Sequence, residues 1–201
     1  MLDRAATGLI SPAIQRLARL LVRAGFSANQ LTLAGFGIGL GAALLVATQH
    51  YPAAIAAILC SRLCDGLDGA MARETRVTDA GGFLDIALDF MFYAAIPLGF
   101  AFADPSRNAL AAACLLAAFV GTMASFLAFA VLAAKRGLSN LAYPDKSFYF
   151  LGGLTEATET LVFFVAMCLL PQHFALLAYV FSAMCLLTTA TRIWWGWRTF
   201  S

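Results

Sequence analysis

The stretch that decides the fold of this chain is residues 65–89, which reads DGLDGAMARETRVTDAGGFLDIALD. Strongly apolar segments lie on both sides of it, yet four of its five aspartates and one of its two arginines recur within it at helical spacing. Charged side chains are costly inside a membrane and normally face a polar interior where they perform a function. The stretch therefore predicts a functional site within a membrane protein.

The composition of the whole chain fixes its class. The chain has 201 residues, 62% of them hydrophobic, and a mean hydropathy of +0.83. Such a sequence is too apolar to expose an ordinary soluble surface, so we expect an integral membrane protein. The net charge of +2 does not suggest binding to nucleic acid. The five cysteines lack paired metal-site spacing and are expected to be buried hydrophobes without disulfides.

Apolar segments long enough to cross a membrane divide most of the chain. A span needs about 20 apolar residues, and each is predicted to be a helix because isolated strands cannot satisfy their backbone in lipid. The predicted spans are approximately 30–49, 52–72, 80–103, 108–134, 148–170 and 172–195. We therefore expect an all-α polytopic protein, with an N-terminal segment at 1–29 and a six-helix membrane domain at 30–201.

The N-terminal segment carries a helix signal of its own. Ser11 and Pro12 suit an N-cap and the first helical position, and Gly25 suits the end of the helix. Apolar and basic side chains alternate between two helical faces, namely Ile14, Leu17, Ala18 and Leu21 against Arg16, Arg19 and Arg23. The pattern predicts an amphipathic helix on a charged membrane surface, although a solvated helix packed on the domain would have much the same sequence. No signal peptide is expected.

The basic residues predict the orientation in the membrane. If the N-terminus is cytoplasmic, twelve of the thirteen lysines and arginines lie near cytoplasmic ends and only Arg107 falls outside. The positive-inside rule then favours cytoplasmic N- and C-termini, with the acidic stretch toward the cytoplasm. We expect the bacterial inner membrane as the location.

Helical periodicity gathers the polar residues of the stretch onto two stripes. The first stripe consists of Asp65, Asp68, Gly69, Ala72 and Arg73, and the second of Gly81, Asp85 and Asp89. Four carboxylates brought together would repel one another unless cations held them. Oxygen ligands suit Mg²⁺ or Mn²⁺, and two such ions beside an arginine can clamp a diphosphate. Two buried Asp–Arg pairs that lock helices together would explain one or two aspartates, but not four with small residues between them.

The spacing resembles the signature of the CDP-alcohol phosphotransferase family, which is D-x-x-D-G-x-x-A-R followed by G-x-x-x-D-x-x-x-D. All eight fixed positions are occupied here. The resemblance implies a six-helix enzyme, usually a homodimer, with a cytoplasmic cavity open to the bilayer. Such enzymes transfer a substituted phosphate from a CDP-linked donor to an alcohol and release CMP. Among donors, the resemblance favours CDP-diacylglycerol.

The same resemblance implies roles for the matching residues. Metal ligands would be Asp65, Asp68, Asp85 and Asp89, with two Mg²⁺ or Mn²⁺ ions expected. Asp89 would also be the catalytic base on the acceptor hydroxyl. The donor would be bound by the remaining signature positions together with one metal ligand, namely Asp68, Gly69, Ala72, Arg73 and Gly81.

A weaker part of the resemblance lies at the start of the first span. Asn29-x-x-Thr32 is similar to a family segment that often reads Pro-Asn-x-x-Thr, and it would add Thr32 to the donor site. Ala28 stands where the proline would be. Helix capping by Ser27 or Asn29 explains the same residues at least as well.

The signature does not identify the acceptor. Outside it, the candidate acceptor residues are Lys146, Glu156, Glu159 and Arg192. A phosphorylated acceptor would need the cations, whereas an amine-bearing acceptor would prefer the carboxylates. Both sets are present, so the choice stays open, as does a helix-pairing role for Glu159.

Two other classes of protein compete with the enzyme. A divalent-cation transporter or channel would also place aspartates within a membrane, but it would gain nothing from Arg73 and would need polar residues continuing to the opposite face. A catalytically silent scaffold of the same fold is the third candidate, and the intact signature argues against it.

Overall fold

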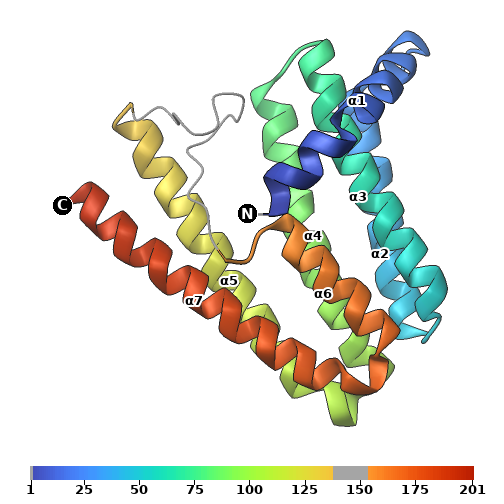
Figure 1. Ribbon diagram of the computed structural model, residues 1–201, viewed down its shortest axis with the longest axis vertical. Helices are drawn as coiled ribbons and strands as arrows, with labels where there is room; N and C mark the ends of the chain where they lie inside the picture. Colours follow the sequence, from blue (N-terminus) through green and yellow to red (C-terminus); the bar gives the residue numbers. More distant parts are fainter. Residues whose placement is uncertain (1, 138–153) are drawn as a thin grey trace.

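In the computed structural model, which describes residues 2–137 and 154–201 with side chains from Pro12 onward, every regular element is a helix (Figure 1). The elements are α1 Leu2–Arg23, α2 Ala28–Ala47, α3 Tyr51–Glu74, α4 Asp79–Ala103, α5 Pro105–Lys135, α6 Ala157–Leu169, the short 3₁₀ helix η1 Pro171–His173, and α7 Phe174–Phe200. The prediction of an all-α protein is therefore confirmed.

Four helical segments are long and apolar enough to cross a membrane. They are Ala28–Ala47, Asp79–Ala103, Pro105–Lys135 and Pro171–Phe200. The second predicted span, α3, has sufficient length but carries charges of the acidic stretch, and α6 has only 13 residues within the described part. The count of six spans and their orientation remain predictions.

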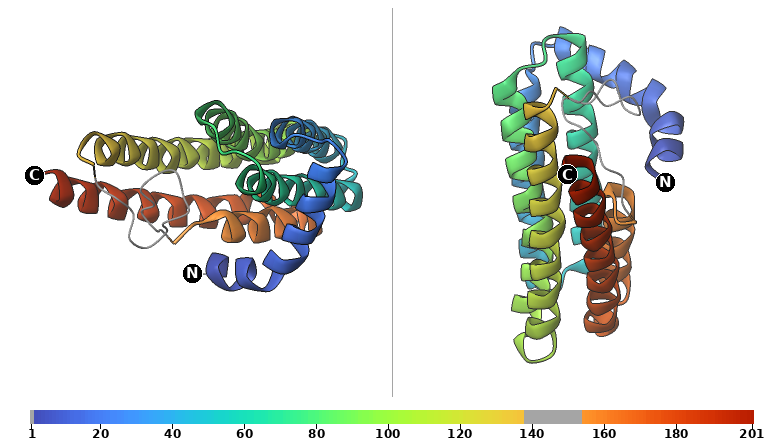
Figure 2. Two further views of the ribbon diagram at one scale, coloured as in Figure 1. Left: turned by 90° about the horizontal axis from the view of Figure 1, so that it is seen from above. Right: turned by 90° about the vertical axis from the view of Figure 1, so that its left-hand side faces the viewer.

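The helices stand in two rows. Seen from above, α2, α4 and α5 form one row and α3, α6 and α7 form the other, with α1 crossing outside α3 (Figure 2). Within the rows, α2 packs on α4 and α4 on α5; between the rows, α2 packs on α3 and α5 on α7. The third and fourth helices themselves make few direct contacts. The sequence predicted them as antiparallel neighbours, and the structure adds that α2 holds them so that their polar stripes face across a gap.

Glycines allow the close approach of α2 to its neighbours. A Cβ atom on Gly35 would lie 2.8 Å from the Cβ of Cys64 in α3, and one on Gly99 would lie 2.6 Å from the carbonyl oxygen of Ala43 in α2. Gly37 and Gly41 face open space, so they do not serve this packing. Small residues at such crossings let membrane helices gain van der Waals contact.

An aromatic core fills the half of the bundle away from the acidic stretch. Five phenylalanines on α4, α6, α7 are fully buried there, namely Phe92, Phe100, Phe164, Phe174 and Phe181. The rings of Phe100 and Phe174 stack with centroids 4.3 Å apart. This core uses the first half of α3 and the second half of α4, which leaves the charged halves of both helices for a site.

The N-terminal helix begins earlier than predicted. It starts at Leu2, so the expected start at Ser11 and Pro12 is wrong, and Pro12 lies inside the helix. A proline lacks only one backbone donor, so a helix can continue through it with a bend. Gly25 does end the helix region, with a φ of 88°.

One face of α1 packs on the helix that carries the first acidic stripe. Ala18, Leu67 and Met71 form a small buried cluster between α1 and α3. Leu17, expected on the same face, is 40% exposed, and Leu20 is 59% exposed. The helix therefore packs on the domain and still presents apolar side chains outward, and its placement on a membrane surface remains a prediction.

Candidate active site

The turn between α3 and α4 fixes where α4, which carries the second stripe, begins. The hydroxyl of Thr78 caps α4 by accepting a hydrogen bond from the backbone N–H of Gly81, at 3.1 Å. A Cβ on Gly81 would lie 3.0 Å from the Thr78 hydroxyl and 3.1 Å from the side-chain oxygen of Asn29 in α2. A larger residue would therefore crowd the Thr78 cap and the Asn29 side chain at the point where the site begins.

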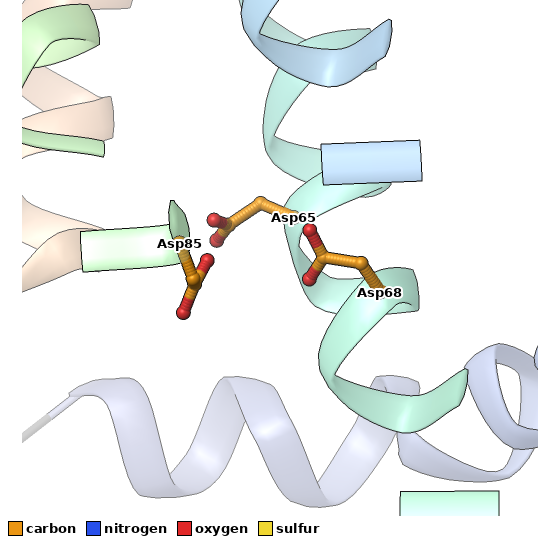
Figure 3. Close-up of side chains that lie close together, drawn as sticks. All are labelled: Asp65, Asp68 and Asp85. Carbon is orange, nitrogen blue, oxygen red and sulfur yellow. The ribbon is translucent and has the colours of Figure 1, made fainter. Parts of the chain in front are cut away.

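Three of the four predicted aspartates converge. Carboxylate oxygens of Asp65, Asp68 and Asp85 all lie within 4.8 Å of one another, and Figure 3 shows Asp85 of α4 facing the other two from across the gap. Asp68 is only 4% exposed, and its Oδ2 has no hydrogen-bond partner. Burying a carboxylate without a partner is unfavourable. A divalent cation would complete this oxygen-only set, so the residues fit Mg²⁺ or Mn²⁺.

The fourth aspartate has a different partner. Asp89 forms an ion pair with Arg62 of α3, whose Nη1 donates to the Asp89 Oδ1. The same Nη1 lies 3.7 Å from Oδ1 of Asp65. Arg62 was not identified as a site residue from the sequence, although its position three residues before Asp65 places it on the same helical stripe. The structure thus pairs Asp89 with an arginine, next to the three-aspartate cluster.

All of the predicted donor-binding residues line one cavity. Its volume is about 420 Å³. Around it lie Thr32, Asp68, Gly69, Ala72, Arg73 and Gly81, together with Asn29 and Arg76 among others. The small side chains and the two arginines give it room and positive charge next to the acidic cluster, which suits a nucleoside diphosphate.

The two explanations for the start of α2 turn out to involve different residues. Ser27 is the N-cap, because its hydroxyl accepts from the Gln30 N–H at 3.3 Å and the Gln30 side chain accepts from the Ser27 N–H at 3.0 Å. Asn29 and Thr32 both line the cavity. Capping therefore explains Ser27, and Asn29 and Thr32 are left on the cavity wall.

A second cavity lies on the other side of Asp89. It has a volume of about 200 Å³ and is enclosed by α4, α5, α7 and the segment that leads into α6. Phe90 and Phe126 line both cavities. Asp89 lines both as well, and also the small hollow that contains the cluster. Asp89 is therefore a shared lining residue of all three spaces.

Two of the four predicted acceptor residues line this second cavity. They are Glu156 and Arg192. Arg192 is 8% exposed; its Nη1 donates to the carbonyl of Thr122 at 3.2 Å, and its Nε is buried without a partner. Glu159 is not on the lining, and its carboxylate instead accepts from the Glu156 N–H at 3.1 Å, closing the cap of α6. Lys146 lies outside the described residues.

Sequence comparison places the chain among enzymes that handle CDP-linked alcohols. A family model described as CDP-alcohol phosphatidyltransferase matches residues 26–194. The inner membrane protein YnjF of Escherichia coli is 53% identical over 199 residues, which cover 99% of this chain and 97% of that protein. The archaetidylinositol phosphate synthase of Pyrococcus horikoshii is 36% identical over 93 residues, covering 46% of this chain and 50% of that protein.

Solved structures with a similar fold include one enzyme in several states. The Mycobacterium tuberculosis phosphatidylinositol phosphate synthase PgsA1 with CDP-DAG bound has a TM-score of 0.70 and 22% identity, with 92% of this chain and 93% of that one covered. The same enzyme in complex with manganese and citrate also has a TM-score of 0.70 and 22% identity, with 92% and 88% covered. At this identity the match establishes a shared fold.

Proposed function

Because the chain belongs to the CDP-alcohol phosphatidyltransferase family, we propose that it transfers a phosphatidyl group from a CDP-linked lipid to an alcohol and releases CMP, in the inner membrane of a bacterium. The observation that carries the proposal is the position of Asp89. Asp89 lines both the cavity of the donor-site residues and the second cavity, and it also lines the hollow that contains the three-aspartate cluster. A base is needed at such a junction, where an acceptor hydroxyl meets a donor phosphate.

The donor is CDP-diacylglycerol. Gly69 and Ala72 leave space for the cytidine, and Arg73 pairs with the diphosphate as a charged donor of hydrogen bonds. PgsA1, which shares the fold, has been solved with CDP-DAG bound. A site on helices that lie in a bilayer can receive the acyl chains of such a donor from the side.

The cation is Mg²⁺ or Mn²⁺, held by Asp65, Asp68 and Asp85. The unpartnered oxygen of buried Asp68 supports this assignment, as does the manganese complex of PgsA1. When bound, the ion stabilises negative charge on the diphosphate as a Lewis acid. Two ions and a metal contact from Asp89 belong to the same hypothesis, on the strength of the family resemblance.

The chain's own residues carry out the proton transfer and the positioning. Asp89 accepts the proton of the acceptor hydroxyl while the new bond forms from that oxygen to the phosphorus that carries the lipid. The bond from this phosphorus to the CMP oxygen breaks, and CMP leaves with the electron pair. Phe90 and Phe126, which line both cavities, limit the space in which the two substrates meet and exclude water from it.

The acceptor carries an anionic group. Arg192 supports this choice, because its buried guanidinium lines the second cavity with an Nε that has no partner. A fixed cation of this kind suits a phosphate on the acceptor. Glu156, on the same cavity, is placed to accept a hydrogen bond from an acceptor hydroxyl.

The cation-channel alternative has less support. Beyond the cluster, α4 continues with the fully buried Phe92, Ile96 and Phe100. A cation pathway needs polar groups through the full thickness of the membrane. In the described part of the chain the apolar core occupies that space instead.

The test is a reconstituted transfer assay. Purified protein with CDP-diacylglycerol, Mg²⁺ or Mn²⁺ and a panel of phosphorylated and unphosphorylated alcohols is expected to release CMP and form lipid product in equal amounts, with the phosphorylated alcohols preferred. Asp79→Asn, in the exposed first turn of α4, is the matched control and keeps full activity. If no acceptor gives CMP above the hydrolysis background, the proposed transfer is wrong. Size measurement in detergent tests the expected homodimer.

A further inference from the structure

A pair of buried threonines joins the segment that enters α6 to the middle of α7. The backbone N–H of Thr155 donates to the hydroxyl oxygen of Thr188 at 3.2 Å, and the Thr155 hydroxyl donates to the same oxygen at 3.0 Å. The Thr188 hydroxyl in turn donates to the carbonyl of Met184 at 3.0 Å. A hydroxyl group offers one donor and two acceptor positions, so that of Thr188 is fully used. We call the two hydrogen bonds between Thr155 and Thr188 the tether.

The tether holds a segment that has few other contacts with α7. In the described part of the chain, few residue pairs join α6 to α7, whereas α5 packs along α7. Thr188 is 1% exposed and Thr155 is 9% exposed, so water cannot replace the bonds between them. Loss of the Thr188 hydroxyl would leave the N–H of Thr155 buried without its partner, which is unfavourable. We therefore expect the segment to move away from α7 when this hydroxyl is lost.

The residues on both sides of the tether line the second cavity. Thr155 and Glu156 line it from the segment that enters α6, and Cys185 and Arg192 line it from α7. Cys185, Thr188 and Arg192 recur at intervals of three and four residues, which places them on one face of α7. The tether therefore sets how far the segment that carries Glu156 lies from Arg192.

We infer that Thr188 is a positioning residue for the acceptor alcohol. Through Thr155 it holds Glu156 at the spacing from Arg192 that suits an acceptor with both an anionic group and a hydroxyl. The inference rests on the proposed function and deepens it, because it assigns part of acceptor recognition to a residue that does not itself line the cavity.

A purely structural role for Thr188 predicts different behaviour. It would lower stability and affect the use of both substrates alike. In the positioning role only the acceptor is affected, because the described residues that line the donor cavity come from α2, α3, α4, α5 and the turn between α3 and α4. The KM for the acceptor should therefore change while the KM for the donor stays the same.

The experiment compares Thr188→Val, which keeps the shape of the side chain without its hydroxyl, with Thr188→Ser, which keeps the hydroxyl. In the Val variant we expect the KM for the phosphorylated alcohol that is transferred fastest to rise about tenfold, as loss of a buried hydrogen bond would give, with the KM for CDP-diacylglycerol unchanged. Exchange of the Thr155 amide hydrogen for deuterium, followed by mass spectrometry of overlapping peptides, should be about tenfold faster. The Ser variant should restore both values.

A second variant keeps the test usable if Thr188→Val does not fold. Thr155→Val removes one of the two bonds of the tether, and we expect it to raise the acceptor KM by about threefold. Thr199→Val is the matched control, because the Thr199 hydroxyl is exposed and donates within α7 to the carbonyl of Trp195 at 2.8 Å. It should change neither KM nor the exchange at Thr155.

An unchanged acceptor KM in Thr188→Val would overturn the positioning role, and so would an equal rise in the KM for both substrates. The exchange measurement needs no turnover. Unchanged exchange at Thr155 would overturn the tether itself. Faster exchange in the Val variant of a protein whose wild type transfers nothing would contradict the proposed function and leave the tether standing.

Discussion

Each of the helices α3 and α4 has one half that packs in the apolar core and one half that carries the charged residues of the site. In one half, Ile58 of α3 and Phe92, Ile96 and Phe100 of α4 are fully buried in the aromatic core. In the other half the same two helices carry the aspartates and enclose cavities. The residues that pack the core and the residues of the candidate site are therefore separated along the axis of each helix. The helix α2 packs on both α3 and α4.

This separation has a physical reason. Cavities and unpartnered charges destabilise a fold, so residues that keep a site open reduce stability unless other contacts fix the backbone. The apolar half supplies those contacts. We therefore expect substitutions in the charged half to alter activity with little loss of stability, and substitutions in the apolar half to do the reverse.

The largest expected effect is from Asp68→Asn, because this aspartate belongs to the cluster and is the most deeply buried of the motif. We expect transfer activity to fall about 1,000-fold, corresponding to about 4 kcal/mol of transition-state stabilisation. Thermal stability measured in detergent without divalent cations should stay the same or rise, because a buried unpaired charge is removed. A large drop in melting temperature would break the proposed separation, and Asp79→Asn serves as the control.

Asp89→Asn is expected to slow the transfer reaction without weakening the binding of the CDP-linked donor. General base catalysis typically contributes at least about 100-fold to the rate, and we expect a loss of about that size here. Binding of CDP-diacylglycerol, measured by equilibrium titration, should stay largely intact. Wild-type turnover in the purified variant would show that another group takes the proton.

Phe100→Ala tests the apolar half. The ring is fully buried and stacks on Phe174. In a soluble core such a change costs about 3–5 kcal/mol, and we expect less here because lipid surrounds the exposed surface in place of water. Thermal denaturation should show the loss, while kcat/KM of the folded fraction stays near that of the wild type. Loss of kcat/KM with unchanged stability would reverse the comparison.

The smallest effect is expected at Asp104, which lies between α4 and α5, outside the spans. Its carboxylate accepts hydrogen bonds from the Ser106 hydroxyl at 2.7 Å and the Arg107 N–H at 3.1 Å, and these contacts lower its pKa. A lowered pKa contributes stability that is complete above the unfolded-state value of about 3.9 and is lost as the pH falls through the folded-state value. Asp104→Asn should therefore melt slightly earlier at neutral pH, and the difference should disappear below the folded-state value.

More of the charged half than of the apolar half could be predicted from the sequence. Helical spacing was sufficient to gather Asp65, Asp68 and Asp85, because a membrane span has almost no alternative to a helix. It did not reveal that Arg62 pairs with Asp89. Four carboxylates and several cations can pair in many ways, and only the arrangement of α2, α3 and α4 selects one.

Features that depend on distant segments could not be predicted in the same way. The second cavity needs α4, α5 and α7 to meet around Phe126, and periodicity gives no information about which helices are neighbours. The earlier start of α1 was missed because Ser11 and Pro12 form a common start signal that the preceding residues override.

The central claim is that the aspartates which converge between α3 and α4 hold a divalent cation beside the donor cavity. The most direct test is a crystal structure with Mn²⁺ and CDP-diacylglycerol, with anomalous scattering measured at the manganese edge. The account predicts a manganese peak ligated by Asp65, Asp68 and Asp85. A map with no peak among these carboxylates at saturating Mn²⁺ would contradict it.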